Sequence, residues 1–297
     1  MLTDFIAKHL LTPGFADTAN NFYIPLAKKL VNSYQQQLKQ QDKNTFFVGV
    51  NGCQGSGKST LTECLAQYIT KEYDLSVVVL SLDDFYYGKA QRQQLAQQHH
   101  PLFQTRGVPG THNVQLLTSV LAQLKRAETN ICLPKFDKAH DKPLPTQHWL
   151  TINSAVDIVL FEGWCWGVPA ESLDNLQLPI NELEAKHDPE GVWRQQVNDA
   201  LREHYQPLYR LMDTWLMLKA PSFDVVFQWR LEQEQKLAKV NSTTANMNSV
   251  MNNSQINNFI QHFQRLTIHG LDVLPAKVNI LFELDNKRKI IASRGID

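Results

Sequence analysis

The sequence predicts an α/β protein in which a mostly parallel sheet is covered by helices on both faces. Two observations indicate this class. Runs of Val, Ile, Leu and Phe alternate along the chain with segments whose apolar residues recur at helical spacing, and each apolar run is continuous. Continuous apolar runs are typical of parallel strands that are buried on both sides. With 297 residues, 43% of them hydrophobic, the chain is long enough to bury an ordinary globular core.

The order of these segments gives the expected elements. Residues 1–44 are helix-like and form an N-terminal helical extension, which precedes a main domain at 45–297. Five strands are expected, at 46–50, 75–84, 157–164, 215–221 and 278–285, with helices at 61–73 and 114–126. Residues 224–238 read as a strand-like or helical run that ends in a helix. Residues 241–258 are rich in Asn and Ser, which predicts a mobile loop.

The composition narrows the class of partner. Lys plus Arg and Asp plus Glu number 29 each, so no net charge draws the protein toward nucleic acid or an anionic membrane. The four cysteines show neither zinc spacing nor a disulfide framework, which favours reduced thiols. Asp4 and Lys8 interrupt the first apolar stretch, unlike a signal peptide, and no segment approaches a membrane span. We therefore expect a cytoplasmic protein that binds small molecules.

Residues 48–60, VGVNGCQGSGKST, contain the pattern G-x-x-x-x-G-K-S of a phosphate-binding loop. The pattern lies between an expected strand and an expected helix, which is the context that the motif requires. Glycines allow consecutive backbone N–H groups to turn toward phosphate oxygens, and the following helix adds its positive dipole end. The nucleotide site is therefore expected to comprise Gly52, Gln54, Gly55, Ser56, Gly57, Lys58, Ser59 and Thr60.

Lys58 and Ser59 have the chemistry that a magnesium-bound triphosphate needs. The Lys58 ammonium can reach the β- and γ-phosphates, while the Ser59 hydroxyl is a ligand for Mg²⁺. Cys53 lies inside the loop at a helix N-terminus, where a thiolate would be favoured, although cysteine also serves as a small neutral filler. The motif predicts a P-loop NTPase three-layer fold that binds ATP and Mg²⁺.

Acidic residues follow two of the expected strands. Asp83 and Asp84 end the strand at 75–84, and Glu162 ends the strand at 157–164. Ligands of parallel sheets bind at the carboxyl ends of the strands, so these acids are expected near the γ-phosphate. A carboxylate there can accept the proton of an alcohol or hold a metal-bound water. Glu162, which would be costly to bury without a cation, is expected to join Ser59 at the metal.

Two loops carry candidate substrate residues. Arg106 lies in the Gly/Pro-rich loop 104–113, and its planar fork suits a carboxylate or a phosphate. The loop 133–145 is either a solvated charged surface or part of a substrate site, and its candidates are Lys135, Asp137 and Lys138. A guanine-reading N-K-x-D and the transporter signature L-S-G-G-Q are both absent from the sequence, which favours a small-molecule kinase over a GTPase switch or a transport ATPase.

The ordered set of motifs resembles the D-glycerate 3-kinase family. The segments are VGVNGCQGSGKST, SLDDFY, RGVPGTHN, PKFDKAHD, LFEGW and FQWRLEQEQKL, and the resemblance extends from about residue 45 to the C-terminus. That family is similar to the phosphoribulokinase, uridine kinase and pantothenate kinase group. The Asn/Ser-rich stretch and the ending VNILFELDNKRKI depart from the family pattern.

The resemblance assigns roles that the local patterns leave open. It implies that Asp83 is the catalytic base and Asp84 a supporting acid, and that Glu162 is the Mg²⁺-associated acid. Arg230 matches the lid arginine that folds over the ATP phosphates, within a lid region around 225–270. Asn198 matches a substrate contact. The catalytic set is then Lys58, Asp83, Arg106 and Arg230, and the substrate set is Asp83, Asp84, Tyr86, Arg106, Lys135, Asp137, Lys138 and Asn198.

These features together predict an ATP-dependent kinase that phosphorylates a hydroxyl of a small hydroxy acid, with D-glycerate as the expected acceptor. Arg106 would bind the acceptor carboxylate. Two alternatives stay open. One is a kinase for another alcohol, such as a pantothenate-like acid or a nucleoside, whose base could stack on Tyr86, Tyr87, Trp164 or Trp166. The other is an ATP-binding sensor that has no acceptor.

Overall fold

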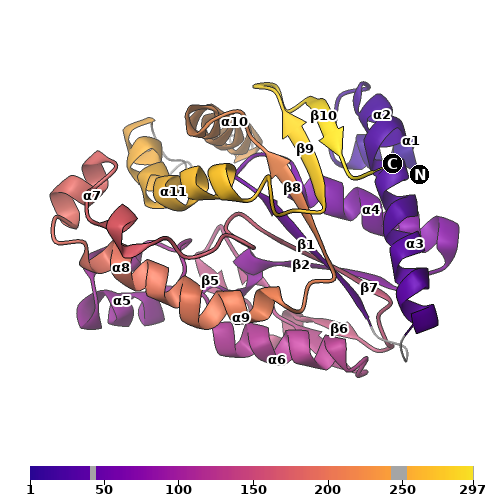
Figure 1. Ribbon diagram of the computed structural model, residues 1–297, viewed down its shortest axis with the longest axis horizontal. Helices are drawn as coiled ribbons and strands as arrows, with labels where there is room; N and C mark the ends of the chain where they lie inside the picture. The colour runs from indigo at the N-terminus through magenta and orange to yellow at the C-terminus, as the bar shows by residue number, and fades with distance from the viewer. Residues whose placement is uncertain (41–44, 242–252, 297) are drawn as a thin grey trace.

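The computed structural model describes residues 1–40, 45–241 and 253–296. A six-stranded sheet of order β10-β9-β8-β1-β7-β2 runs through the molecule (Figure 1). All neighbouring strands are parallel except β10, which pairs antiparallel with β9. The strands are β1 (Phe46–Gly52), β2 (Val77–Ser81), β7 (Ile158–Gly163), β8 (Thr214–Lys219), β9 (Ile280–Leu284) and β10 (Ile290–Arg294). The predicted fold class is therefore confirmed.

Helices cover both faces of this sheet. The α-helices are α1 (Leu2–Lys8), α2 (Phe15–Thr18), α3 (Ile24–Gln40), α4 (Lys58–Tyr73), α5 (Lys89–Gln98), α6 (Val114–Lys125), α7 (Glu182–His187), α8 (Val192–Ala200), α9 (Gln206–Tyr209), α10 (Phe223–Asn241) and α11 (Asn253–Val273). Two π-helical turns, η1 (Ala19–Tyr23) and η6 (Leu201–Tyr205), join α2 to α3 and α8 to α9. No helix of the described part is long and apolar enough to cross a membrane.

Short elements connect the main ones. The 3₁₀ turns are η2 (Leu82–Phe85), η3 (Pro101–Gln104), η4 (Thr146–His148) and η5 (Leu173–Leu176). Two small antiparallel ribbons lie between α6 and β7: β3 (Ile131–Leu133) pairs with β6 (Leu150–Ile152), and β4 (Phe136–Asp137) pairs with β5 (Lys142–Pro143). The second ribbon holds the loop whose charged residues were substrate candidates.

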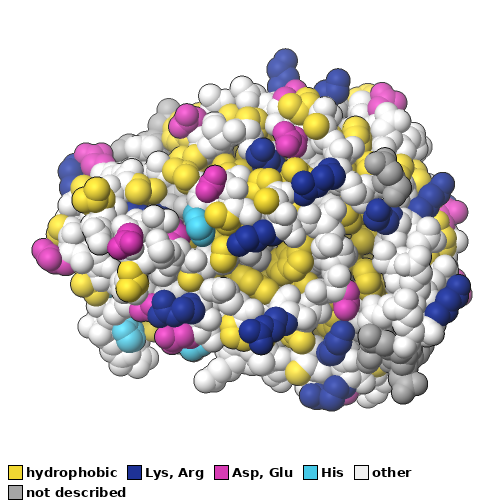
Figure 2. All heavy atoms as spheres, in the orientation of Figure 1, with side chains coloured by type: hydrophobic (Ala, Val, Ile, Leu, Met, Phe, Trp, Pro, Cys, Tyr) yellow, Lys and Arg dark blue, Asp and Glu magenta, His cyan; other side chains and the backbone are white. Residues whose placement is uncertain are grey.

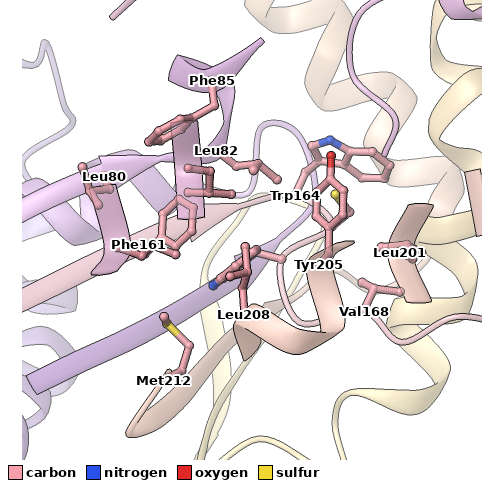
Figure 3. Close-up of a cluster of buried hydrophobic side chains, with 14 of the residues drawn as sticks. Leu80, Leu82, Phe85, Phe161, Trp164, Val168, Leu201, Tyr205, Leu208 and Met212 are labelled. Atoms are coloured by element: carbon pink, nitrogen blue, oxygen red, sulfur yellow. The ribbon is translucent and has the colours of Figure 1, made fainter. Parts of the chain in front are cut away.

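Alternate residues of the strands enter two separate cores, because successive side chains of a strand point to opposite faces. On β7, Val159 and Phe161 join one buried cluster, whereas Ile158 and Leu160 join the other. Figure 3 shows part of the first cluster, in which Leu80 and Phe161 from neighbouring strands lie with residues that follow α8, among them Leu208 and Met212.

The N-terminal helices pack into the second core. This cluster includes Phe5, Tyr23 and Leu26 together with residues of β1 and β9. Phe22 meets Phe282 of β9 edge to face, with ring centroids 5.9 Å apart. Residues 1–40 therefore share one hydrophobic core with the sheet, whereas residues 41–44 lie outside the described part.

Three expectations about elements need correction or completion. The expected strand at 75–84 ends at Ser81, and Asp83 and Asp84 lie in the turn η2. The run at 224–238, whose type was left open, belongs to helix α10. The loop expected at 241–258 is wrong for residue 241, which ends α10, and for residues 253–258, which begin α11. Residues 242–252 lie outside the described residues.

Candidate active site

The phosphate-loop motif lies where the sequence predicted it, between β1 and α4. The backbone adopts positive φ angles at Gly55 (77°) and Gly57 (95°), a region that side chains rarely tolerate. A Cβ atom on Gly55 would also lie 2.8 Å from the Cβ of Trp229 on α10. The loop therefore depends on glycine for both its turn and its contact with α10, and it leads into a helix N-terminus that attracts anions.

Lys58, Ser59 and Glu162 form a connected group beside this loop. The Ser59 hydroxyl donates to Oε1 of Glu162 at 3.0 Å, and Lys58 Nζ lies 3.9 Å from Oε2. Lys58 also donates to the carbonyl of Cys53 at 3.1 Å. Glu162 is the penultimate residue of β7, and both Val50 of β1 and Ser81 of β2 are its register partners. The central strands thus carry the buried acid to the mouth of the loop.

Two buried polar atoms of the loop lack partners among the described residues. Oγ of Ser56 and Oε1 of Gln54 are buried, and neither has a hydrogen-bond partner among the described residues. Buried polar atoms normally find partners, so such orphans indicate a site built for a ligand. The hydroxyl of Ser59 and the carboxylate of Glu162 are hard oxygen donors of the kind that Mg²⁺ accepts alongside phosphate oxygens.

Asp83 faces the phosphate loop from η2 and has both carboxylate oxygens engaged. Tyr86 donates its hydroxyl to Oδ1 at 2.8 Å, and Lys138 donates to Oδ2 at 2.5 Å. Burial alone would raise the pKa of Asp83, but Lys138, Tyr86 and Lys58 outweigh it and lower the pKa to about 2. Burial and Asp83 raise the pKa of Tyr86, which keeps its hydroxyl protonated as a donor. Asp83 is therefore ionised at neutral pH.

Asp84 and its neighbours make contacts within the protein. Lys135 donates to Oδ2 of Asp84 at 2.7 Å, and the backbone N–H of Phe136 donates to Oδ1 at 3.2 Å. Asp84 thereby anchors β4 near the end of β2. Asp137 caps a tight turn by accepting from the backbone of Ala139 and His140. These contacts give Asp84, Lys135 and Asp137 structural roles beside the site, while their substrate contacts stay predictions.

Arg106 lies in an ion-pair triad. Its guanidinium donates to Oδ1 of Asp141 at 2.5 Å, while Arg92 donates to Oδ2 of the same carboxylate at 2.5 Å. Arg106 also lies over the ring of Phe136, 5.7 Å from its centroid. The triad fixes the loop 133–145 against the loop that carries Arg106.

A pocket of about 400 Å³ joins these groups. Most of the predicted site residues line it, namely Gln54, Gly55, Gly57, Lys58, Ser59, Thr60, Asp83, Tyr86, Arg106, Lys138, Glu162 and Arg230. Residues that the sequence reasoning did not assign to the site complete its wall: Leu11, Phe259, Phe263 and Arg288, together with Trp164, which had been considered only as a stacking surface. The pocket combines a phosphate cradle, a carboxylate and several cations.

Arg288 is the clearest functional candidate that the sequence reasoning missed. It lies between β9 and β10, where its guanidinium donates to the carbonyl of Gly55 at 2.7 Å and pairs with Glu232 at 2.7 Å. It also lies 5.0 Å above the ring of Trp229. Arg288 thus ties the phosphate loop to α10. The only sequence signal for it was a basic turn after the last expected strand.

Arg230 and Asn198 were both assigned by resemblance, and they differ in outcome. Arg230 of α10 lines the pocket and lies 5.4 Å from the centroid of the Phe259 ring on α11. Asn198 is 2% exposed. Its amide accepts from the backbone N–H of Glu171 and donates to the carbonyl of that residue. Asn198 therefore holds a buried segment and does not line the pocket, and its expected substrate contact stays a prediction.

Burial also corrects the expectation for Cys53. The thiol is 5% exposed, and burial raises its pKa to about 12 although Lys58 acts in the opposite direction. The thiolate expected at a helix N-terminus is therefore not formed, and Cys53 fits the role of a small neutral filler. All four cysteines are free thiols, as expected.

A second pocket, of about 650 Å³, lies between α5, α6 and the α8–α9 segment. Its lining includes Leu95, Phe103, Val114 and Leu208, and no residue of the phosphate loop. The volume of a pocket alone therefore does not identify the active site. The smaller pocket holds the phosphate cradle and the strand-end acids.

The fold and this pocket define a class of protein: a P-loop kinase, with its site at the carboxyl ends of the parallel strands. No family model matches the chain. The "Uncharacterized kinase mug58" of Schizosaccharomyces pombe is 32% identical over 267 residues, spanning 86% of this chain and 91% of that protein. The "Probable ATP-dependent kinase TDA10" of Saccharomyces cerevisiae is 28% identical over 214 residues, spanning 66% and 69%.

A solved structure agrees with these relatives. The "D-glycerate 3-kinase" from Cryptococcus neoformans superposes with a TM-score of 0.76 at 25% identity, covering 92% of this chain and 98% of that one. The chain therefore belongs to the D-glycerate 3-kinase-like family of P-loop kinases. It is an ATP-dependent phosphotransferase.

Proposed function

We propose that this kinase transfers the γ-phosphoryl group of Mg·ATP to a hydroxyl of a small hydroxy acid, with D-glycerate as the acceptor. One observation carries the proposal: the Asp83 carboxylate shares a pocket with the phosphate loop and with the cations Arg106 and Lys138. A carboxylate can accept an alcohol proton, and cations can hold an acid group. The similarity to the D-glycerate 3-kinase of Cryptococcus neoformans supports D-glycerate as the acceptor.

The reaction follows from this arrangement. The acceptor hydroxyl gives its proton to Asp83 while its oxygen forms a bond to the γ-phosphorus. The bond between that phosphorus and the β,γ-bridging oxygen breaks, and the electron pair leaves with ADP. Backbone N–H groups of 54–59 and the Lys58 ammonium hold the phosphates in line. Positioning and charge stabilisation of this kind supply most of the catalysis in phosphoryl transfer.

Ser59 and Glu162 would hold Mg²⁺, because their oxygens already meet beside Lys58. The ion would neutralise charge on the β- and γ-phosphate oxygens. Arg230 would add a further positive charge from α10. The lid region expected around residues 225–270 stays a prediction, and its residues 242–252 lie outside the described part. An arginine that closes on the transferring group is worth ~10³ or more in rate.

The pocket lining favours a small acid over a nucleoside. Tyr86 is 6% exposed and stacks on His112 with ring centroids 4.5 Å apart, so its face is covered. Trp166 is buried, and neither it nor Tyr87 lines the pocket. Trp164 donates to the carbonyl of Gly107 and packs on Phe263. These contacts argue against an open aromatic slot for a base.

An acceptor panel tests the proposal. ADP release from Mg·ATP is measured with D-glycerate, L-glycerate, pantothenate and a set of nucleosides, and the product is identified by mass. We expect stimulation by D-glycerate and none by nucleosides, and we expect the Lys58→Ala protein to show no turnover. Stimulation by nucleosides alone would overturn the hydroxy-acid assignment. The absence of stimulation by any acceptor would favour the ATP-binding sensor.

A further inference from the structure

Lys138 contacts the carboxylate that an acceptor needs. Its ammonium donates to Oδ2 of Asp83 at 2.5 Å, while the Tyr86 hydroxyl donates to Oδ1 at 2.8 Å. A carboxylate offers about four lone pairs, so these two contacts do not saturate Asp83. The Lys138 ammonium nevertheless competes with an acceptor hydroxyl for Oδ2, so its departure would open the carboxylate to the acceptor proton.

Two of the pocket's cations, Arg106 and Lys138, differ in how many contacts restrain them. Arg106 shares Asp141 with Arg92, whose side chain is 3% exposed, and it also packs over Phe136. The side chain of Lys138 is 59% exposed and forms an ion pair with Asp83. Because its end of the pair lies in solvent, the Lys138 ammonium can exchange this contact for one with another anion. Lys138 is therefore the less restrained of the two cations.

The backbone around Lys138 is fixed, which confines the movement to its side chain. Asp137 accepts from the N–H groups of Ala139 and His140, and the carbonyl of Lys138 accepts from Arg106 at 3.4 Å. A lysine side chain carries a compact ammonium on a flexible four-carbon stem. The ammonium can therefore reach a new anion while the Cα stays in place.

We infer that Lys138 masks Asp83 until an anionic acceptor binds, and that the acceptor's own carboxylate draws Lys138 away and frees the base. The inference rests on the proposed function. It makes Lys138 the residue that distinguishes hydroxy acids from neutral alcohols of the same shape. The same mask suppresses ATP hydrolysis, in which water would give its proton to Asp83 as its oxygen bonds the γ-phosphorus and ADP leaves.

The test compares Lys138→Gln with Lys142→Gln, a charge-matched change at an exposed lysine of the same loop. ADP release from Mg·ATP is measured without acceptor, with glycerol and with D-glycerate. In the wild type we expect slow release alone, no stimulation by glycerol and strong stimulation by D-glycerate. In Lys138→Gln we expect faster acceptor-free hydrolysis and a ~10- to 100-fold higher KM for D-glycerate, the size expected for a lost charge-assisted hydrogen bond. Lys142→Gln should match the wild type.

A second variant separates masking from other effects of the lost charge. In Lys138→Gln/Asp83→Asn, acceptor-free hydrolysis should fall back to the wild-type level or below, because the unmasked base is gone. Wild-type hydrolysis and wild-type preference for D-glycerate over glycerol in Lys138→Gln would overturn the inference. If the wild type accepts no hydroxy acid, the proposed function fails, while the hydrolysis comparison still decides whether Lys138 masks Asp83.

Discussion

Cys53 illustrates how strongly a single environment alters a residue's chemistry. Its place at a helix N-terminus normally favours a thiolate. Here the thiol is buried within the phosphate loop, and burial raises its pKa to about 12. The neutral form therefore persists well above physiological pH.

Alkylation tests whether the buried Cys53 is less reactive than an exposed cysteine. Iodoacetamide at pH 8 should label Cys132, which is exposed, and leave Cys53 unmodified, because the reactive species is the thiolate. Peptide mapping by mass spectrometry identifies the labelled residue, and calorimetry measures ATP binding before and after. Rapid labelling of Cys53 in the folded protein would contradict the assigned burial.

At the residue scale, the sequence placed residues in the pocket where a local pattern carries the chemistry. Lys58 and Ser59 follow from a motif with fixed spacing, and Glu162 from its place near a strand end, and all three line the pocket. Arg288 and Phe263 carry no such pattern, because they reach the pocket only through the packing of distant segments. Asn198 lies outside the pocket for a related reason, since sequence does not reveal whether an amide faces a pocket or a buried backbone.

At the scale of elements, the phosphate loop and α10 depend on one glycine. Gly55→Ala places a Cβ 2.8 Å from Trp229 at a residue with φ of 77°. Strain of this kind costs about 1–3 kcal/mol, so we expect lower stability and weakened ATP binding. Urea unfolding and calorimetry measure the two effects.

Gly14→Ala is the matched control for this prediction. No heavy atom lies within 4 Å of a Cβ at Gly14, and its φ is −62°. The change should alter stability by no more than about 0.5 kcal/mol. If Gly55→Ala and Gly14→Ala had the same stability and the same ATP affinity, the close contact between Gly55 and α10 would not be required.

A buried ion pair joins α11, which forms part of the pocket wall, to α7. Arg265 donates to both oxygens of Glu184, at 2.9 and 2.6 Å, and Glu184 is 0% exposed. Arg265→Met would leave that carboxylate buried and without its cation, a loss that costs about 3–5 kcal/mol. Chemical unfolding measures the effect. The double variant Arg265→Met/Glu184→Leu should lose less stability than Arg265→Met, and a larger loss would contradict this explanation.

Element-scale prediction depended on periodicity. The central strands are continuous apolar runs and were recognised, whereas β10 was missed because only Ile290 of its residues is buried. The start of α11 was misread as loop because Asn and Ser dominate its first residues. Its later apolar residues, including Ile260 and Phe263, pack the helix into place. Tertiary packing overrode local propensity at this helix.

At the scale of the whole molecule, the strand order assembles the site. β1 lies between β7 and β8, and β2 follows β7, so the phosphate loop, Glu162 and the turn with Asp83 emerge along one edge. Figure 2 shows acidic and basic side chains interspersed on the face viewed, in keeping with equal numbers of both charges. The pocket itself gathers the cations Lys58, Arg106, Lys138, Arg230 and Arg288, which can attract an anion locally.

The central claim is that the phosphate loop holds the triphosphate within reach of a carboxylate that deprotonates the acceptor. The most direct measurement is single-turnover transfer by Asp83→Asn from Mg·ATP to the acceptor that the panel identifies, beside calorimetric ATP binding. The account predicts unchanged ATP affinity and transfer that is slower by ~10² to 10⁴, the usual span for loss of a general base. Transfer at the wild-type rate would contradict it.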